Sequence, residues 1–206
     1  IDWARSMTVP ARGRREGAVQ EGAGEPRHET AGGRPDPGRP PVACLFFPYL
    51  KGERTPLWNP DARGMLVGAA GDAGDILQAV HQGIAFSIRN GIDLMEQAGC
   101  RFAGPVVSTG GASGDGRFLQ LKADAVGKPF ALTQVRDAEL LGIAMVLAVA
   151  DGWYPDVREA ARALVKMGRV FQPREKPARM YDLLYRQYLE VQAALVPFFE
   201  EQAGRR

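Results

Sequence analysis

Hydrophobic and polar positions along the chain predict short strands separated by helices. An apolar run at residues 42–47, ended by a proline, has the length of a buried strand. Residues 65–67 are expected to form a second short strand. A long helix should follow, because apolar residues recur every four positions on one stripe: Ile76, Val80, Ile84, Ile88 and Ile92. Asp72 or Asp75 can cap the start of this helix, and Gly99 suits its end.

The same alternation continues through the middle of the chain. Strands are predicted at residues 105–109 and 128–133, with a helix between them at residues 116–126. Residues 139–149 are apolar nearly all round. A helix without a polar face is typical of a protein interior, so this pattern predicts a buried helix.

Two amphipathic helices are expected in the last part of the chain. The first has an apolar face made by Val157, Ala161, Leu164 and Val165. The second should start near Pro177, a good first-turn proline, and continue until Pro197 disturbs it. Its apolar face is made by Tyr181, Leu184, Tyr188, Val191 and Leu195. Strands that alternate with helices predict the α/β class, with a sheet covered by helices.

The composition is that of an ordinary globular protein, and it excludes several functional classes. The chain has 206 residues, which corresponds to one domain or one and a half. With 24% charged residues and a net charge of +2, it offers no strongly charged surface for nucleic acid or a membrane. No apolar run approaches the roughly 18 residues of a spanning helix. Two cysteines cannot form a disulfide scaffold and fit a reducing compartment, so a cytoplasmic location is expected.

One stretch departs from this ordinary composition. Residues 10–41 hold 7 Gly, 6 Pro and 6 Arg in 32 positions, with Val19 as their one aliphatic residue larger than Ala. Such a segment buries too little apolar surface to offset its ordering entropy, so we expect it to be disordered or loosely packed. A basic arm for nucleic acid is disfavoured, because glutamates interrupt the arginines and no aromatics are interleaved. His28 lies in this stretch and His81 in a helix, where partial exposure is expected, and neither has zinc-site spacing.

The main candidate for chemistry is the segment 106–127, in which a predicted strand runs into Gly110 and Gly111 before a helix. Glycine lets a phosphate approach the backbone because it has no Cβ. The turn amides and the helix N-terminus supply a positive local field. Neither a Walker A loop nor a GxGxxG fingerprint is present. A tight turn that requires a positive φ explains the two glycines equally well, so both interpretations stay open.

A second candidate is the polar, turn-rich loop within residues 46–64. It carries two carboxylates and two guanidinium groups, at Glu53, Arg54, Asp61 and Arg63. We expect an Ω-type structural loop organised by its own salt bridges. The alternative is a loop bordering a cleft, with its arginines facing phosphate. Pairing of these arginines with Glu53 and Asp61 is the favoured interpretation.

Four segments together resemble the C-terminal half of the FGGY carbohydrate kinase family, which includes xylulokinase and glycerol kinase. FFPYLKGERTPLWNPDARG, residues 46–64, is similar to the family's PYLxGERTPxxNPxARG, and AVHQGIAFSIRNGIDLM, residues 79–95, to AVLEGVAFxxRDGLDxM. STGGASGDGRFLQLKADAVGKP is similar to GGGAxSxxWxQxxADVxGxP, and DAELLGIAMVLAVADG to EAxALGAAxLAxxxxG. The combination is specific, although each segment alone is not. Two departures are Gln82 for the usual Glu and His81 for the usual Leu.

The resemblance implies an actin-like, ribonuclease-H-like ATPase domain with a mixed sheet covered by helices. Family members transfer the γ-phosphoryl group of MgATP to a sugar or polyol hydroxyl, so ATP and Mg²⁺ are the implied cofactors. Carried over by position, Gly110, Gly111, Ala112 and Ser113 would line the turn against the ATP phosphates. Asp115 falls where the family often has Ser or Asn near the nucleoside. A different actin-like nucleotide-binding protein is disfavoured, because the GERTP segment is specific to the sugar kinases.

The family's N-terminal domain carries an Asp-x-Gly-Thr phosphate loop, the sugar site and the catalytic aspartate, and none of these occurs here. Together with Ile1 in place of Met, this predicts a kinase fragment truncated at its start and inactive alone. Residues 1–9 would be a remnant of a preceding helix, 10–41 an insertion or frame-shifted stretch, and 42–206 the nucleotide-binding domain. The alternative is a non-catalytic remnant or interaction module that retains the fold. An exposed cleft face could also drive homodimer formation.

Overall fold

Strands form two separate sheets in the ranges that the computed structural model describes, which are 35–36, 38–55, 58–69, 71–110, 114–135 and 137–203. β1 (Leu45–Phe47) pairs antiparallel with β2 (Met65–Val67). The second sheet has the order β3 (Val106–Ser108), β4 (Phe130–Thr133) and β5 (Met167–Phe171). β3 runs parallel to β4, and β5 is antiparallel to β4. The sheet is therefore mixed, and the predicted α/β class is confirmed.

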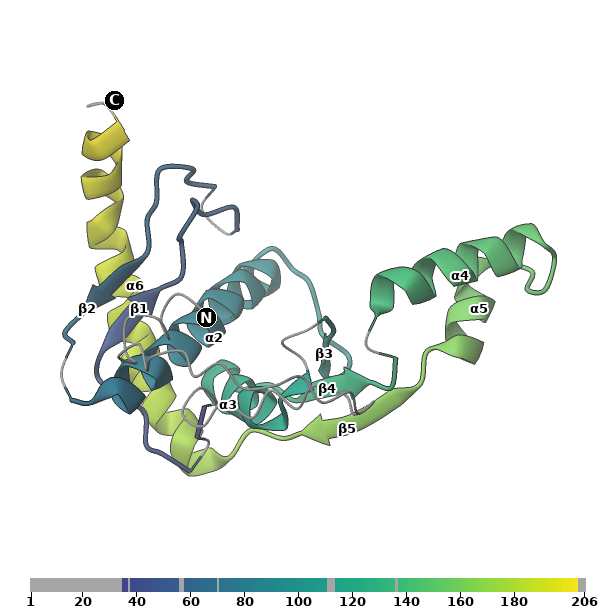
Figure 1. Ribbon diagram of the computed structural model, residues 1–206, viewed down its shortest axis with the longest axis horizontal. Helices are drawn as coiled ribbons and strands as arrows, with labels where there is room; N and C mark the ends of the chain where they lie inside the picture. Colours follow the sequence, from purple (N-terminus) through teal and green to yellow (C-terminus); the bar gives the residue numbers. More distant parts are fainter. Residues whose placement is uncertain are drawn as a thin grey trace, which may run out of the picture.

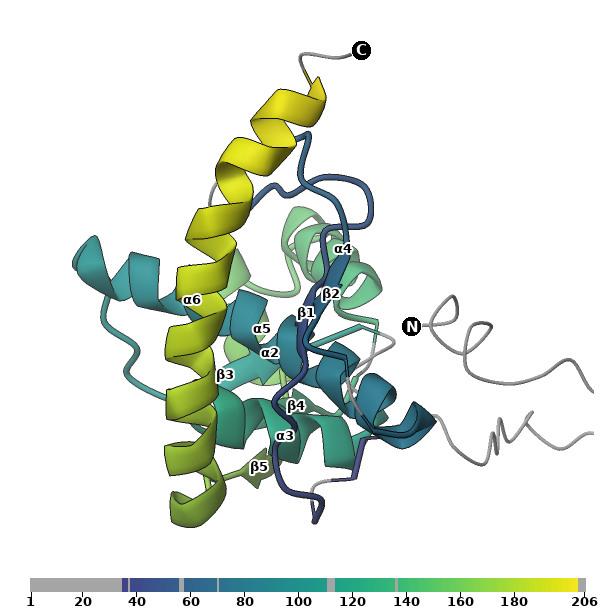
Figure 2. The ribbon, with the colours of Figure 1, turned by 90° about the vertical axis from the view of Figure 1, so that its left-hand side faces the viewer.

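Three helices enclose the main core: α2 (Ala73–Gln97), α3 (Gly116–Val126) and α6 (Glu175–Ala203). α2 packs on β1 and α3, and α3 packs on α6. Figures 1 and 2 show α6 running along one side of the molecule, while the pair α4 (Ala138–Ala150) and α5 (Val157–Leu164) extends from the opposite end. The sheet of β3, β4 and β5 lies between these two parts (Figure 1).

The start of α2 is fixed by both of the predicted capping residues. The backbone N–H of Asp75 donates to Asp72 Oδ1 at 2.9 Å, and the N–H of Asp72 donates to Asp75 Oδ2 at 3.1 Å. This reciprocal capping box satisfies two amides that the helix leaves without a partner. Arg39 adds ion pairs to the two carboxylates, at 2.6 Å to Asp75 and 3.2 Å to Asp72. The residues just before β1 are thereby attached to α2.

The middle of α2 is buried on more than the predicted stripe, because residues 77–83 are all buried. Partial exposure was expected for His81, and this prediction is wrong: the side chain is 2% exposed. Its Nδ1 lies 2.7 Å from the Leu77 carbonyl oxygen, and its ring meets the ring of Phe118 edge-on. α3 covers this face of α2, and a stripe of residues on α2 alone does not reveal such a neighbour.

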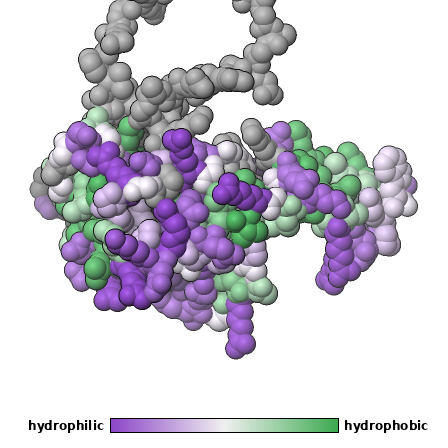
Figure 3. Space-filling view, turned by 90° about the horizontal axis from the view of Figure 1, so that it is seen from below, coloured by the Kyte–Doolittle hydropathy of each residue, from purple (hydrophilic) through white to green (hydrophobic). Residues whose placement is uncertain are grey.

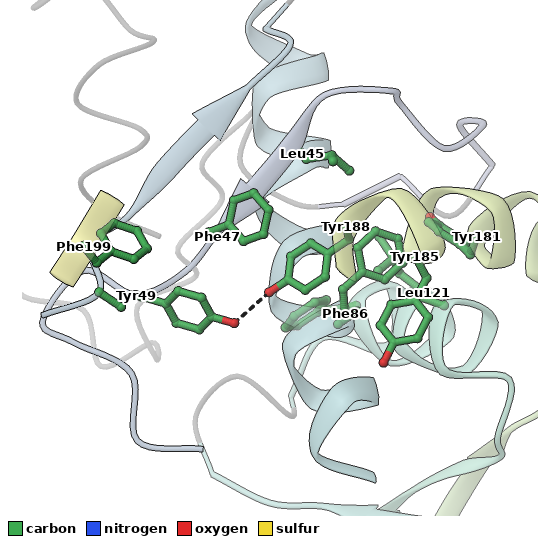
Figure 4. Packing of buried hydrophobic residues seen from close by; sticks show 13 residues of the cluster. Leu45, Phe47, Tyr49, Phe86, Leu121, Tyr181, Tyr185, Tyr188 and Phe199 are labelled. Carbon is green, nitrogen blue, oxygen red and sulfur yellow. Dashed lines mark hydrogen bonds between the residues drawn. The ribbon is translucent and has the colours of Figure 1, made fainter. Parts of the chain in front are cut away.

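A cluster of aromatic rings forms the centre of the core between β1, α2 and α6 (Figure 4). The rings of Phe47 and Tyr188 are stacked with their centroids 4.6 Å apart, and Phe86 packs against Tyr188 at 5.4 Å. The hydroxyl groups of Tyr49 and Tyr188 are 3.0 Å apart, and Gln192 donates to the Tyr49 hydroxyl. The apolar face predicted for the last helix is confirmed, because all its members are buried or packed against this cluster.

The bounds of this last helix differ from the prediction at both ends. α6 begins at Glu175, two residues before Pro177, and it continues through Pro197 to Ala203. A proline inside a helix removes one backbone hydrogen bond. Here the loss falls in the last two turns, and Phe199, which is buried in the main core, holds these turns in place. Tertiary packing therefore outweighs the local cost of the proline.

α4 contradicts the sequence-based expectation most clearly. Its apolar sequence predicted a buried helix, but Met145 is its one buried residue. Four large side chains are between 57% and 65% exposed: Leu140, Ile143, Val146 and Leu147. Figure 3 shows hydrophobic side chains gathered on the arm that α4 forms with α5. An apolar sequence indicates that a helix needs neighbouring elements to bury it. Within the described residues, α5 packs against one side of α4 and leaves the other side exposed.

None of the helices within the described ranges is both long and apolar enough to cross a membrane.

Candidate functional site

The turn between β3 and α3 lies at the carboxyl end of β3, at the point where the chain leaves the sheet. The unit is a parallel crossover, because β3 pairs in parallel with β4 and α3 connects them. Gly110 has a φ of 83°, a left-handed conformation that side chains with a Cβ rarely adopt. A Cβ on Gly110 would meet no atom of the described residues within 4 Å, so among these residues the dihedral angle, and not crowding, favours glycine here. Gly111, Ala112 and Ser113 lie outside the described residues.

Asp115 begins α3 and uses its carboxylate as the helix cap. Its Oδ1 accepts the backbone N–H of Arg117 at 2.9 Å, and its carbonyl oxygen accepts the N–H of Leu119. A carboxylate at this place interacts favourably with the positive end of the helix dipole. It thereby takes up part of the field that would otherwise attract an anion. The structure thus gives Asp115 a definite structural role beside the turn.

Lys122, two turns into α3, brings a positive charge to the base of the same turn. The residue is 6% exposed, and its Nζ donates to Ser108 Oγ at 3.4 Å. Nζ also lies 4.4 Å from the centroid of the Phe118 ring. Burial lowers the pKa of the Lys122 ammonium below its ordinary value. Sequence reasoning missed this residue, because lysine on a helix is usually solvated.

The opposite face of α3 is fixed to the start of α6 by Asp124. The Asp124 carboxylate is fully buried, and it accepts three hydrogen bonds from Arg174: from the backbone N at 2.7 Å, Nε at 3.0 Å and Nη2 at 2.6 Å. Gln120 Nε2 donates to it as well, at 3.0 Å. A buried carboxylate that is satisfied in this way is rigid. The helix that follows the turn is therefore held in one position.

The contacts described for the loop within residues 46–64 join side chains to its own backbone, and the expected salt bridges stay a prediction. Arg63 Nη1 donates to the carbonyl oxygens of Pro60 and Ala62, at 2.9 and 2.8 Å. Asn59 Oδ1 accepts the N–H groups of Asp61 and Ala62, at 3.0 and 3.1 Å. Through the Tyr49 hydroxyl, the start of the loop is tied to α6. These contacts agree with the expected structural loop.

The departure at Gln82 is explained by its contacts with the chain before β1. Its Oε1 accepts the backbone N–H of Val42 at 2.9 Å, and its Nε2 donates to the Val42 carbonyl at 3.0 Å. The amide thus pairs with both backbone groups of one residue, which a carboxylate could not do. This pairing also explains why β1 begins at Leu45, three residues after the predicted start at Val42.

Metal-ligating and redox groups are scattered. Within the described ranges, no group of three or more His, Cys, Asp or Glu side chains is placed to hold a metal ion. Both cysteines are free thiols: Cys44 is buried, which raises its pKa, and Cys100 is exposed. The geometry of the described residues thus offers a backbone turn with a nearby buried ammonium.

Known protein sequences and families agree on one relationship. The sequence model of the FGGY family of carbohydrate kinases, C-terminal domain, matches residues 14–150. The xylulose kinase of Bacillus subtilis is 31% identical over 149 residues, which are 71% of this chain and 30% of that protein. The FGGY carbohydrate kinase domain-containing protein of Homo sapiens is 32% identical over 155 residues, 73% of this chain and 28% of that protein. The chain thus spans about 30% of the length of these relatives.

Solved structures show the same fold. The ligand-bound xylulose kinase of Lactobacillus acidophilus superposes with a TM-score of 0.71 at 25% identity, over 79% of this chain and 34% of that one. The glycerol kinase of Plasmodium falciparum, solved with ADP, superposes with a TM-score of 0.60 at 20% identity, over 73% of this chain and 31% of that one. The fold is therefore the actin-like ATPase fold of these kinases. The chain belongs to the FGGY family of carbohydrate kinases and carries the C-terminal domain of that family.

Proposed function

We propose that this chain is the ATP-binding part of a carbohydrate kinase, with the nucleotide phosphates held at the β3–α3 turn. The observation that carries this proposal is the left-handed Gly110, two residues after the parallel strand β3 and in the connection to α3, a helix that is rigidly held. Glycine lets an anion approach the backbone closely because it has no Cβ, and the N-terminal end of a helix favours negative charge. Gly110, Gly111, Ala112 and Ser113 would line the phosphates, and Asp115 would lie toward the nucleoside ribose.

The fit of this turn to the implied cofactors differs between ATP and Mg²⁺. Among the described residues, no atom lies within 4 Å of a Cβ built at Gly110, which is compatible with the close approach of a phosphate. The described residues hold no cluster of acidic side chains for Mg²⁺. We therefore expect Mg²⁺ to arrive on the phosphates of the nucleotide. When bound, MgATP supplies an activated γ-phosphoryl group for transfer to an alcohol.

The acceptor would be a sugar or polyol, and the xylulose kinases among the relatives make a pentulose the first candidate. Transfer requires a group that orients or deprotonates the acceptor hydroxyl. In the family that this sequence resembles, an aspartate of the N-terminal domain has that role. No residue of this sequence corresponds to that aspartate. We propose that residues 42–206 form the nucleotide half and that the 206-residue chain alone does not turn over.

A non-catalytic interaction module is the second candidate, and one observation favours it. The exposed apolar face of α4 is a surface of the kind that mediates association. Formation of a homodimer, which the sequence suggested through an exposed cleft face, stays a prediction. Nucleotide binding discriminates the two candidates, because an interaction module has no need to retain it.

Two measurements test the proposal. Titration calorimetry of the purified chain with ATP and ADP should show saturable binding, which Gly110→Val should weaken, because valine is strained at this φ. A coupled assay for sugar-dependent ADP production should show no turnover by the chain alone. Absence of nucleotide binding at millimolar concentration would favour the interaction module. Robust sugar-dependent turnover would instead show that the chain is a complete catalyst.

A further inference from the structure

Lys122 carries a buried charge that the fold itself does not explain. Its contacts within the described residues are the Ser108 hydroxyl and the Phe118 ring, and no carboxylate is among them. An ammonium group has three N–H donors, and Ser108 takes one. The contact with the ring offsets part of the desolvation cost, because the face of an aromatic ring attracts a cation.

A buried ammonium without a counter-ion is costly to maintain. Removing such a charge from water is unfavourable unless it is paired and hydrogen-bonded, and an apolar side chain of similar size would be cheaper. The other buried charge of α3, on Asp124, is fully paired with Arg174. Lys122 is therefore the group on this helix for which a partner from outside the chain would make the greatest difference.

The direction of the side chain points to where that partner would lie. Helical side chains lean toward the helix N-terminus, and Lys122 does so by reaching over Phe118, one turn nearer the start of α3. Its ammonium reaches Ser108, the last residue of β3, two positions before Gly110. The charge thus lies at the base of the β3–α3 turn.

The turn needs a positive charge from elsewhere to hold a polyphosphate well. Asp115 caps the start of α3 with its carboxylate and offsets the dipole of that helix. Nearby cations are otherwise occupied or solvated: Arg174 is bound to Asp124, and Arg117 is exposed. A fixed ammonium in a region of low dielectric acts on an anion more strongly than a solvated one.

We propose that Lys122 is the built-in counter-charge for the nucleotide phosphates at the β3–α3 turn, so that the ligand supplies the negative charge that the fold lacks. This inference rests on the proposed nucleotide function and adds to it the residue that favours phosphate over an uncharged nucleoside. The buried charge lowers the stability of the ligand-free domain and raises its affinity for polyphosphates.

The test compares Lys122→Met with Lys128→Gln in the full chain. Lys128 also loses one positive charge in its variant, but it is paired with Glu96 away from the turn. Calorimetric titrations use ADP, tripolyphosphate and adenosine. We expect Lys122→Met to weaken the binding of ADP and tripolyphosphate about tenfold or more. Adenosine binding should be unchanged in this variant, and Lys128→Gln should bind all three probes as the parent chain does.

Thermal unfolding without ligand separates this role from a structural one. Lys122→Met should melt at the same temperature as the parent chain or higher, and Lys122→Arg should retain affinity for ADP. Equal affinity of Lys122→Met and the parent chain for ADP and tripolyphosphate would overturn the inference and leave the proposed function intact. Failure of both Lys122→Met and Lys122→Gln to fold would overturn it too. A parent chain that binds no probe would overturn the proposed function itself.

Discussion

The backbone of α2 touches the backbone of β1 at Gly83 and Phe46. A Cβ on Gly83 would lie 2.0 Å from the Phe46 carbonyl oxygen, which is closer than any real contact of this kind. Gly83→Ala should therefore push α2 away from β1 and destabilise the domain by about 3 kcal/mol, at the upper end for overpacking. The free energy of unfolding in urea measures this loss.

Gly91 in the same helix is the matched control. Among the described residues, a Cβ there would meet the Thr55 methyl group alone, at 3.9 Å, an ordinary van der Waals distance. Gly91→Ala should stabilise the domain by about 0.5 to 1 kcal/mol, because alanine is the better helix former. Equal effects of the two substitutions would show that α2 and β1 are not in direct backbone contact at Gly83.

A carboxylate at position 82 should be harmful in this chain. Gln82→Glu replaces the amide that donates to the Val42 carbonyl and so brings a negative charge against an acceptor. We expect a loss of about 1 to 3 kcal/mol in unfolding free energy at pH 7. Gln97→Glu, at the exposed end of the same helix, should change it by less than about 0.5 kcal/mol.

The pH dependence of the Gln82→Glu variant follows from the same geometry. Burial next to an acceptor raises the pKa of a carboxyl group in the folded state. Its protonated form is then favoured by folding, so the loss should be small below the unfolded pKa of about 4.3 and should appear as the pH rises above it. A loss that is constant from pH 4 to pH 8 would argue against this contact.

The aromatic core should make the protein sensitive to alkali. Burial raises the pKa values of four tyrosine hydroxyls above their ordinary value: Tyr49, Tyr181, Tyr185 and Tyr188. The neutral phenols are retained in the folded state, whereas the unfolded chain loses their protons near pH 10. Stability is therefore intact below pH 10 and should fall above it by about 1.4 kcal/mol per pH unit for each phenol.

Unfolding titrations between pH 8 and pH 12 check this expectation. Tyr188→Phe should make the fall of the unfolding free energy with pH less steep by the contribution of one phenol. At neutral pH this variant also loses the hydrogen bond between the Tyr188 and Tyr49 hydroxyls. A chain whose stability did not change between pH 9 and pH 11 would show that these phenols are solvated.

The exposed face of α4 should bind hydrophobic dyes. The combined variant Leu140→Lys and Leu147→Lys should lower the fluorescence of a bound anilinonaphthalene dye, with a change in unfolding free energy within about 0.5 kcal/mol. Leu183→Lys, at a similarly exposed leucine on α6, is the control. Dye fluorescence that did not change in the variant with both α4 substitutions would mean that α4 is covered in solution.

The sequence predicts the elements of this fold better than it predicts their surroundings. Strand β2 and helix α3 have the predicted bounds, because periodicity and capping are local properties. β5 was not predicted, since Gly168 and Arg169 interrupt its apolar pattern and its burial is set by the pairing with β4. The burial of His81 and the exposure of α4 depend likewise on which elements are adjacent.

In the candidate site, too, local features could be predicted from the sequence and features that depend on tertiary contacts could not. The glycines of the turn could be found from the sequence, because glycine before a helix signals a backbone conformation that other residues avoid. Lys122 could not, because its significance lies in burial against Phe118 and Ser108 and not in its residue type. Asp115 was predicted near the nucleoside, and its role as the cap of α3 appeared only in three dimensions.

Nucleotide affinity of the isolated chain is the decisive quantity. Isothermal titration of the 206-residue chain with ADP should give saturable binding near one equivalent, about tenfold weaker for Lys122→Met and unchanged for Lys128→Gln. No saturable heat with ADP or ATP at millimolar concentration, from a chain shown to be folded, would contradict the assignment of the β3–α3 turn as a nucleotide site.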